Sequence, residues 1–225
     1  MSLADVNKCI YESAIKSGRN PVEIIIIAVT KAFPVEIMEE AYNLGLTVLG
    51  ESRVQEAKIK IPLFKNRDQT EIHLIGHLQS NKVRSAVNLF DVIESVDTLK
   101  LAEKINQVAA EEGKIMPVFM QVNSGEDPAK FGISPQDALE IGKKIHNLKN
   151  LRLTGLMTIA PNNSTESTLR KTFKITRNIQ ESLFAAGAEN CESLSMGMTF
   201  DYQLAIEEGA THIRLGTALF GDRPK

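Results

Sequence analysis

Lys31 is the residue of this chain whose position most clearly suggests covalent chemistry. It follows Ile24 to Thr30, a run rich in β-branched residues that is apolar on both faces and predicts a strand buried in a parallel sheet. Pro34 suits the first turn of a following helix, so Lys31 lies just past the carboxyl end of the strand. A lysine there can be partly desolvated and form a Schiff base with a carbonyl. The alternative is a solvated lysine that marks the strand end.

Two short segments near the C-terminus combine glycine with hydroxyl groups. Residues 195–199 read Ser-Met-Gly-Met-Thr, and residues 216–218 read Gly-Thr-Ala. Glycine lets backbone amides approach an anion, and a hydroxyl can donate to it. Because each segment follows a predicted strand, the pair predicts a phosphate site. Glycines in such places also serve as plain turn residues.

Arg214 lies on the last predicted strand, two residues before the second glycine segment. A buried arginine needs a partner. That partner is either a carboxylate such as Glu51 or Asp201, or a ligand atom that accepts a fixed hydrogen bond.

A lysine, a phosphate cradle and an arginine together imply a flat aldehyde that carries a phosphate, and pyridoxal 5′-phosphate (PLP) meets that description. Lys31 would form the Schiff base, and Arg214 would face the pyridine nitrogen. The residues expected to hold the phosphate are Ser195, Gly197, Gly216 and Thr217.

Eight predicted strands alternate with helices and position these residues. The strands are expected at 24–30, 47–49, 72–75, 90–95, 116–122, 151–157, 193–196 and 211–215. Strict alternation indicates a parallel sheet, and eight units in this length fit one α/β domain, 1–225, with a TIM-type (β/α)8 barrel. An extra helix over 3–17 precedes the first strand. A doubly wound open sheet is the alternative, but no GxGxxG motif follows the first strand.

One helix boundary is a specific expectation. Asp97 precedes an apolar periodicity that includes Leu101, Ile105 and Val108, so it is predicted to cap the helix that begins there.

The composition argues against several other classes of protein. The 225 residues hold 26 basic and 28 acidic side chains, a formal charge of −2 with no strongly basic segment, so no nucleic-acid surface is expected. Cys9 and Cys191 lie far apart without metal-type spacing, so no metal site is expected. We expect no signal peptide and no membrane span, and therefore a cytoplasmic protein.

Several ordered motifs resemble those of the pyridoxal phosphate homeostasis protein family. The motifs are Ala-Val-Thr-Lys at 28–31, Gly-Glu-Ser-Arg-Val-Gln-Glu at 50–56, His-Leu-Ile-Gly-His-Leu-Gln-Ser-Asn-Lys at 73–82, Gly-Leu-Met-Thr at 155–158, Leu-Ser-Met-Gly-Met-Thr-Phe-Asp at 194–201 and Ile-Arg-Leu-Gly-Thr-Ala-Leu-Phe-Gly at 213–221. The resemblance implies a barrel like the N-terminal domain of alanine racemase. It also implies PLP on Lys31 and a role in keeping PLP available but controlled.

The roles of two residues expected near the carboxyl end of the barrel are not assigned. The family usually has asparagine where this chain has Ser52, so a contact near the cofactor ring is not carried over. His77 follows the third strand, where a lone histidine is more often packed or solvated than catalytic.

Three functions follow as alternatives. The first is a PLP carrier or regulator with an open site, without defined turnover, which serves PLP-dependent apo-enzymes and is a monomer. The second is an amino-acid racemase or related PLP enzyme. Such a racemase needs a second base. In the alanine racemase relatives that base is a tyrosine from a second domain, whereas this chain stops at Lys225. Tyr202 is the nearest tyrosine, but it is expected to pack a helix. The third is a barrel enzyme that acts on a phosphorylated metabolite without PLP.

Overall fold

The chain folds into a closed barrel of eight parallel strands in sequential order. The computed structural model describes residues 2–222. The strands are β1 (Ile25–Val29), β2 (Val48–Glu51), β3 (Glu71–Leu74), β4 (Val92–Val96), β5 (Met116–Gln121), β6 (Leu151–Met157), β7 (Ser193–Met198) and β8 (His212–Leu215). The barrel closes where β1 pairs with β8, with Ile27 opposite Arg214. The TIM-type barrel is therefore confirmed, and the open doubly wound sheet is wrong.

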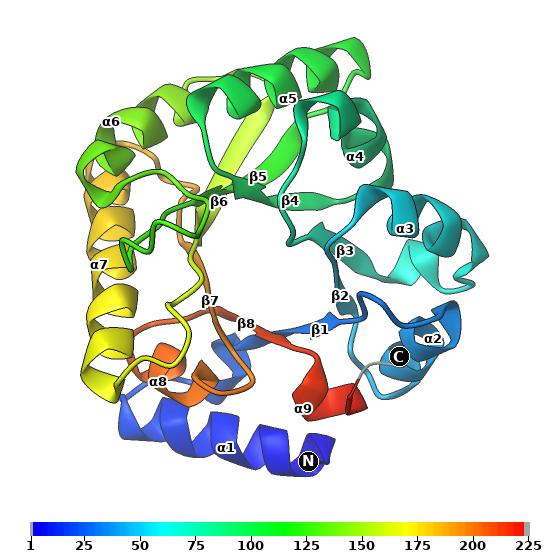
Figure 1. Ribbon diagram of the computed structural model, residues 1–225, viewed down its shortest axis with the longest axis vertical. Helices are drawn as coiled ribbons and strands as arrows, with labels where there is room; N and C mark the ends of the chain where they lie inside the picture. Colours follow the sequence, from blue (N-terminus) through cyan, green and yellow to red (C-terminus); the bar gives the residue numbers. More distant parts are fainter. Residues whose placement is uncertain (1, 223–225) are drawn as a thin grey trace.

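A helix follows each strand and covers the outside of the barrel (Figure 1). These helices are α2 (Val35–Asn43), α3 (Val54–Lys60), α4 (Val83–Leu89), α5 (Leu99–Glu111), α6 (Pro135–His146), α7 (Glu166–Ala185), α8 (Tyr202–Glu207) and α9 (Thr217–Phe220). The expected N-terminal helix is present as α1 (Leu3–Lys16), and it packs beside α8. Between residues 2 and 222, no helix combines the length and the apolar character that crossing a membrane requires.

The predicted cap at Asp97 is wrong by one residue. The Thr98 hydroxyl accepts the hydrogen bond from the Leu101 N–H and caps α5. Asp97 instead pairs with His77, whose Nδ1 lies 3.0 Å from its carboxylate. Asp97 therefore contacts a residue of the loop after β3 and does not cap α5.

Two apolar clusters divide the interior. The large cluster joins strand residues to helix residues such as Met38, Ala57 and Phe173, so it fills the space between barrel and helices. The small cluster contains only strand residues at its centre, Val92, Phe119 and Met157, and lies inside the barrel. Barrel interiors are usually filled by Val, Ile and Leu. Here the interior also contains buried polar side chains, among them His73, Glu94 and Arg214.

Cys191 should resist thiol reagents in the folded protein. It is fully buried in the large cluster, and burial raises the pKa of its thiol to about 12. Because the thiolate is the reactive form, labelling of the native protein near neutral pH is expected to spare Cys191 until the chain is denatured. Peptide mass spectrometry checks this, with half-buried Cys9 as the internal comparison. Rapid native labelling of Cys191 would contradict the packing.

Candidate functional site

Lys31 lies in a short loop that several side chains hold from outside the barrel. The loop continues β1 at the carboxyl end and contains Ala32, whose φ of 61° is in the left-handed region. The Ala32 N–H donates to Glu56 Oε1 at 2.6 Å. Non-glycine residues adopt this conformation only where their surroundings impose it. The lysine is therefore presented by a shaped turn.

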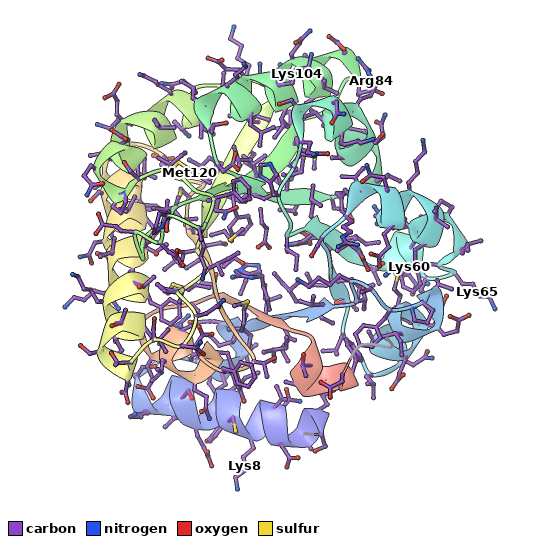
Figure 2. All side chains as sticks on the ribbon, in the orientation of Figure 1. Lys8, Lys60, Lys65, Arg84, Lys104 and Met120 are labelled. Carbon is purple, nitrogen blue, oxygen red and sulfur yellow. The ribbon has the colours of Figure 1, made fainter. Side chains whose placement is uncertain are left out.

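Lys60 holds the two ends of this turn. Its amine donates to the carbonyls of Thr30, at 2.9 Å, and Phe33, at 3.0 Å, and it lies 2.6 Å from Glu51 Oε1. These oxygen atoms supply the hydrogen-bond partners that a buried amine needs. Lys60 belongs to α3 (Figure 2). Only 6% of its side chain is exposed. Sequence reasoning missed Lys60, because a lysine in an amphipathic helix normally lies on the solvated face.

Glu51 is the carboxylate partner of this amine. The Thr30 hydroxyl also donates to Glu51 Oε1, at 2.6 Å. Burial raises the pKa of Glu51, and the neighbouring Lys60 opposes that rise. Within residues 2–222, Glu51 Oε2 is buried and accepts no hydrogen bond. The carboxylate thus depends on Lys60 for its charge balance.

Arg214 is almost fully buried on β8, and three hydrogen bonds hold its guanidinium. Nη1 donates to the Ser195 carbonyl at 2.8 Å and to the Ser195 hydroxyl at 2.7 Å, and Nη2 donates to the Thr158 carbonyl at 2.7 Å. A guanidinium has five N–H donors, so two of them have no partner among residues 2–222. These two donors are the feature that a ligand would need.

The carboxylates considered as partners from the sequence do not form a salt bridge with Arg214. Glu51 pairs with Lys60 instead, and Asp201 accepts from the Met198 N–H at 2.6 Å. Burial lowers the pKa of Arg214, and the negative charges of Glu94 and Asp201 oppose this. An arginine stays protonated at ordinary pH in any case, so it can only donate.

Ser195 lies behind the arginine rather than in an open loop. It is fully buried on β7, and its hydroxyl donates to Glu94 Oε2 at 2.6 Å while accepting from Arg214. Because both roles of the hydroxyl are used, Ser195 supports the guanidinium directly.

The two glycine segments flank β8 at the carboxyl end of the barrel. Gly197 has a φ of 94°, and a Cβ there would lie 2.9 Å from the Cα of Tyr202. Gly216 precedes Thr217 at the start of α9, and a Cβ on it would lie 3.3 Å from the Val29 carbonyl. The first segment lies on β7, where Met198 is opposite Arg214. The second follows β8 directly and lies against Val29 of β1, the strand that leads to Lys31.

His73 and Glu94 are site residues that sequence reasoning missed. Both are inside the barrel, with His73 Nδ1 2.6 Å from Glu94 Oε1. Burial alone would lower the pKa of His73, but its hydrogen bonds to Glu71 and Glu94 raise it to about 9. Charged residues within otherwise apolar predicted strands were the signal that could have revealed them.

His77 and a second lysine complete the same end of the barrel. The His77 ring stacks on Phe131 with centroids 3.9 Å apart, and its Nδ1 is held by Asp97. Lys130, in the loop after β5, donates to the Ala160 carbonyl, and burial lowers the pKa of its amine. Among residues 2–222, no group of three or more His, Cys, Asp or Glu could hold a metal ion.

Comparisons with known proteins agree with this geometry. The family model "Alanine racemase, N-terminal domain" matches residues 16–224. The pyridoxal phosphate homeostasis protein of Vibrio alginolyticus is 37% identical over 211 residues, covering 92% of this chain and 90% of the relative. That of Aquifex aeolicus is 36% identical over 221 residues, covering 98% and 96%.

Solved structures give the same answer for the fold. PipY of Synechococcus elongatus, solved with PLP bound, has a TM-score of 0.83 and 37% identity, and the match covers 94% of this chain and all of PipY. An alanine racemase of Clostridium difficile has a TM-score of 0.73 at 19% identity, covering 98% of this chain and 57% of the racemase, and shows the fold alone. The chain belongs to the pyridoxal phosphate homeostasis protein family, whose barrel is of the alanine racemase N-terminal domain type.

Proposed function

We propose that this chain binds PLP at the mouth of the barrel and serves intracellular PLP homeostasis. Lys31 holds the cofactor as a Schiff base in an open site, and Arg214 faces the pyridine nitrogen. The observation that carries the proposal is the fixed guanidinium with two remaining donors. The names of the relatives and the PLP-bound PipY structure support it. We assign the phosphate to Gly197, Gly216 and Thr217. Ser195 holds the guanidinium of Arg214.

The charge of Arg214 favours holding PLP over transforming substrates with it. PLP supplies an aldehyde that amines can attack and a ring that withdraws electrons. The ring withdraws best when its nitrogen is protonated, and enzymes that stabilise carbanions commonly place an acid there. Arg214 donates to that nitrogen and keeps it unprotonated. An open site also lets acceptor amines, including those of apo-enzymes, reach the cofactor.

A racemase is the second candidate, because alanine racemase shares the fold. Racemisation needs a second base on the opposite face of the substrate. Tyr202 is 4% exposed and packs in the large cluster, Tyr42 donates to Gln69 at 2.5 Å, and Tyr11 lies exposed on α1. These positions favour a carrier without turnover over a racemase. We take this carrier to act as a monomer in the cytoplasm.

Adding PLP to the purified protein tests the proposal. The wild type is expected to gain a visible absorption band, Lys31→Ala is expected to gain none, and Lys130→Ala, which removes another amine at the same end, should match the wild type. Amino acids incubated with the PLP-loaded protein should keep their configuration. Steady racemisation that Lys31→Ala abolishes would favour the second candidate. A wild type that never gains the band would leave a barrel enzyme for a phosphorylated metabolite.

A further inference from the structure

A chain of hydrogen-bonded polar side chains crosses the barrel interior behind Arg214. Its Nη1 donates to the Ser195 hydroxyl at 2.7 Å, which donates to Glu94 Oε2 at 2.6 Å. Glu94 Oε1 lies 2.6 Å from His73 Nδ1, and His73 Nε2 lies 3.0 Å from Glu71 Oε1. Glu71 begins β3 at the other end of the barrel, and 52% of its side chain is exposed. The chain therefore connects the mouth with the opposite opening.

Every member of the chain that is fully buried has its partners. Both oxygens of Glu94 and both ring nitrogens of His73 are bonded. Buried charges are costly to fold unless they are paired and hydrogen-bonded. A complete network of this kind fixes one arrangement of its members, because any rotation would leave a buried polar atom without a partner.

The charges within the barrel also balance. His73, with a pKa of about 9, is an imidazolium near neutral pH. Burial alone would raise the pKa of Glu94, but the hydrogen bond and charge of His73, together with Arg214 and Ser195, lower it. The neighbouring His212, whose pKa burial lowers to about 4, is neutral. The groups that face His73 are Glu71 from β3, Glu94 from β4 and His212 from β8, together with the uncharged Phe119 from β5. Arg214 from β8 acts on His212 and Glu94.

We infer that His73 and Glu94 are positioning residues that set how Arg214 meets the ring nitrogen of the ligand. Glu94 takes the only proton of the Ser195 hydroxyl, so a lone pair of that hydroxyl must face Arg214. His73 in turn orients Glu94. These contacts fix the guanidinium in one orientation, and the ligand would meet the two donors that they leave. This inference rests on the proposed function, because PLP is the ligand that it serves.

The test is PLP affinity in three variants, measured by equilibrium dialysis. Glu94→Gln and His73→Gln are each expected to weaken PLP binding by about tenfold or more near neutral pH, the scale seen when residues that orient a ligand-binding group are changed. His212→Gln is the matched control, because His212 lies beside His73, with ring centroids 6.2 Å apart, but contacts Thr211 instead of Glu94. It should bind as the wild type does.

The pH profile separates positioning from loss of structure. The wild type loses the charge of His73 as the pH rises through about 9, whereas His73→Gln has no such charge to lose. Because a charge-assisted hydrogen bond is stronger than a neutral one, the neutral His73 should hold Glu94 less firmly, and the ratio of the dissociation constants of this variant and the wild type should fall above that pH. For His212→Gln the ratio should not change with pH.

Each outcome is decisive. A wild type that does not bind PLP overturns the proposed function. A wild type that binds, with Glu94→Gln and His73→Gln binding equally well, overturns the inference alone. A loss in His73→Gln that is the same at every pH also overturns it, since that pattern indicates general damage to the fold.

Discussion

Replacing Lys60 with methionine is expected to lower the free energy of unfolding by about 3–5 kcal/mol, the range for breaking one partner out of a buried ion pair. The substitution removes the cation beside Glu51 and both hydrogen bonds to the carbonyls of Thr30 and Phe33. Chemical denaturation measures the change. Lys58→Met is the matched control, because Lys58 is an exposed lysine on the same helix, and its effect should be small.

The loss in Lys60→Met should depend on pH in a defined direction. Without the amine, burial raises the folded pKa of Glu51 further above its ordinary value of 4.5. A carboxyl whose pKa is raised by folding stabilises the folded state below its unfolded pKa, and that contribution is lost as the pH rises through the folded pKa. The variant should therefore be most stable in acid relative to the wild type. A variant as stable as Lys58→Met at every pH would show that Lys60 does not support the turn at Lys31.

The second large effect is expected at Gly197, which combines two constraints. Its φ of 94° is unfavourable for alanine, and a Cβ would lie 2.6 Å from the Cβ of Ala205 and 2.9 Å from the Cα of Tyr202. Strain at such a position costs on the order of 1–3 kcal/mol, and overpacking adds a similar amount. Gly197→Ala should thus be strongly destabilised or should displace the loop after β7, with a matching loss of PLP binding.

Gly187 provides a control with a similar φ. Its φ is 99°, but an added Cβ would meet no atom within 4 Å. Gly187→Ala should therefore show only the conformational cost and should bind PLP normally. Thermal unfolding and PLP titration of both variants make the comparison. Equal behaviour of the two would mean that the contact of Gly197 with α8 is not what shapes the proposed phosphate loop.

The alternation of strands and helices was predictable because each strand is an apolar run bounded by turn residues. The predicted strands at 116–122 and 151–157 match β5 and β6 to within one residue at either end. The cap of α5 was displaced from Asp97 to Thr98, because either side chain can cap a helix and only the position of His77 explains the choice. The local sequence pattern determines where a helix begins, but not which of two adjacent polar residues caps it.

The candidate site was predictable only for residues that lie at strand ends. Lys31 and Arg214 follow from their places in the pattern and from the family motifs. Lys60, His73 and Glu94 do not, since their roles depend on partners that only the closed barrel brings together: Thr30 lies 30 residues before Lys60, and Glu94 lies 21 residues after His73. A buried charge within a strand or on a helix is visible in a sequence, but its partner is not.

The most direct test of the account is borohydride reduction of the PLP-loaded wild-type protein, followed by peptide mass mapping. The account predicts that the yellow band disappears and that a single pyridoxyl adduct lies on the peptide that contains Lys31. Lys130 is the informative competitor, because its amine is also partly buried at this end of the barrel. An adduct on Lys130 or on scattered surface lysines, with none on Lys31, would contradict the central claim.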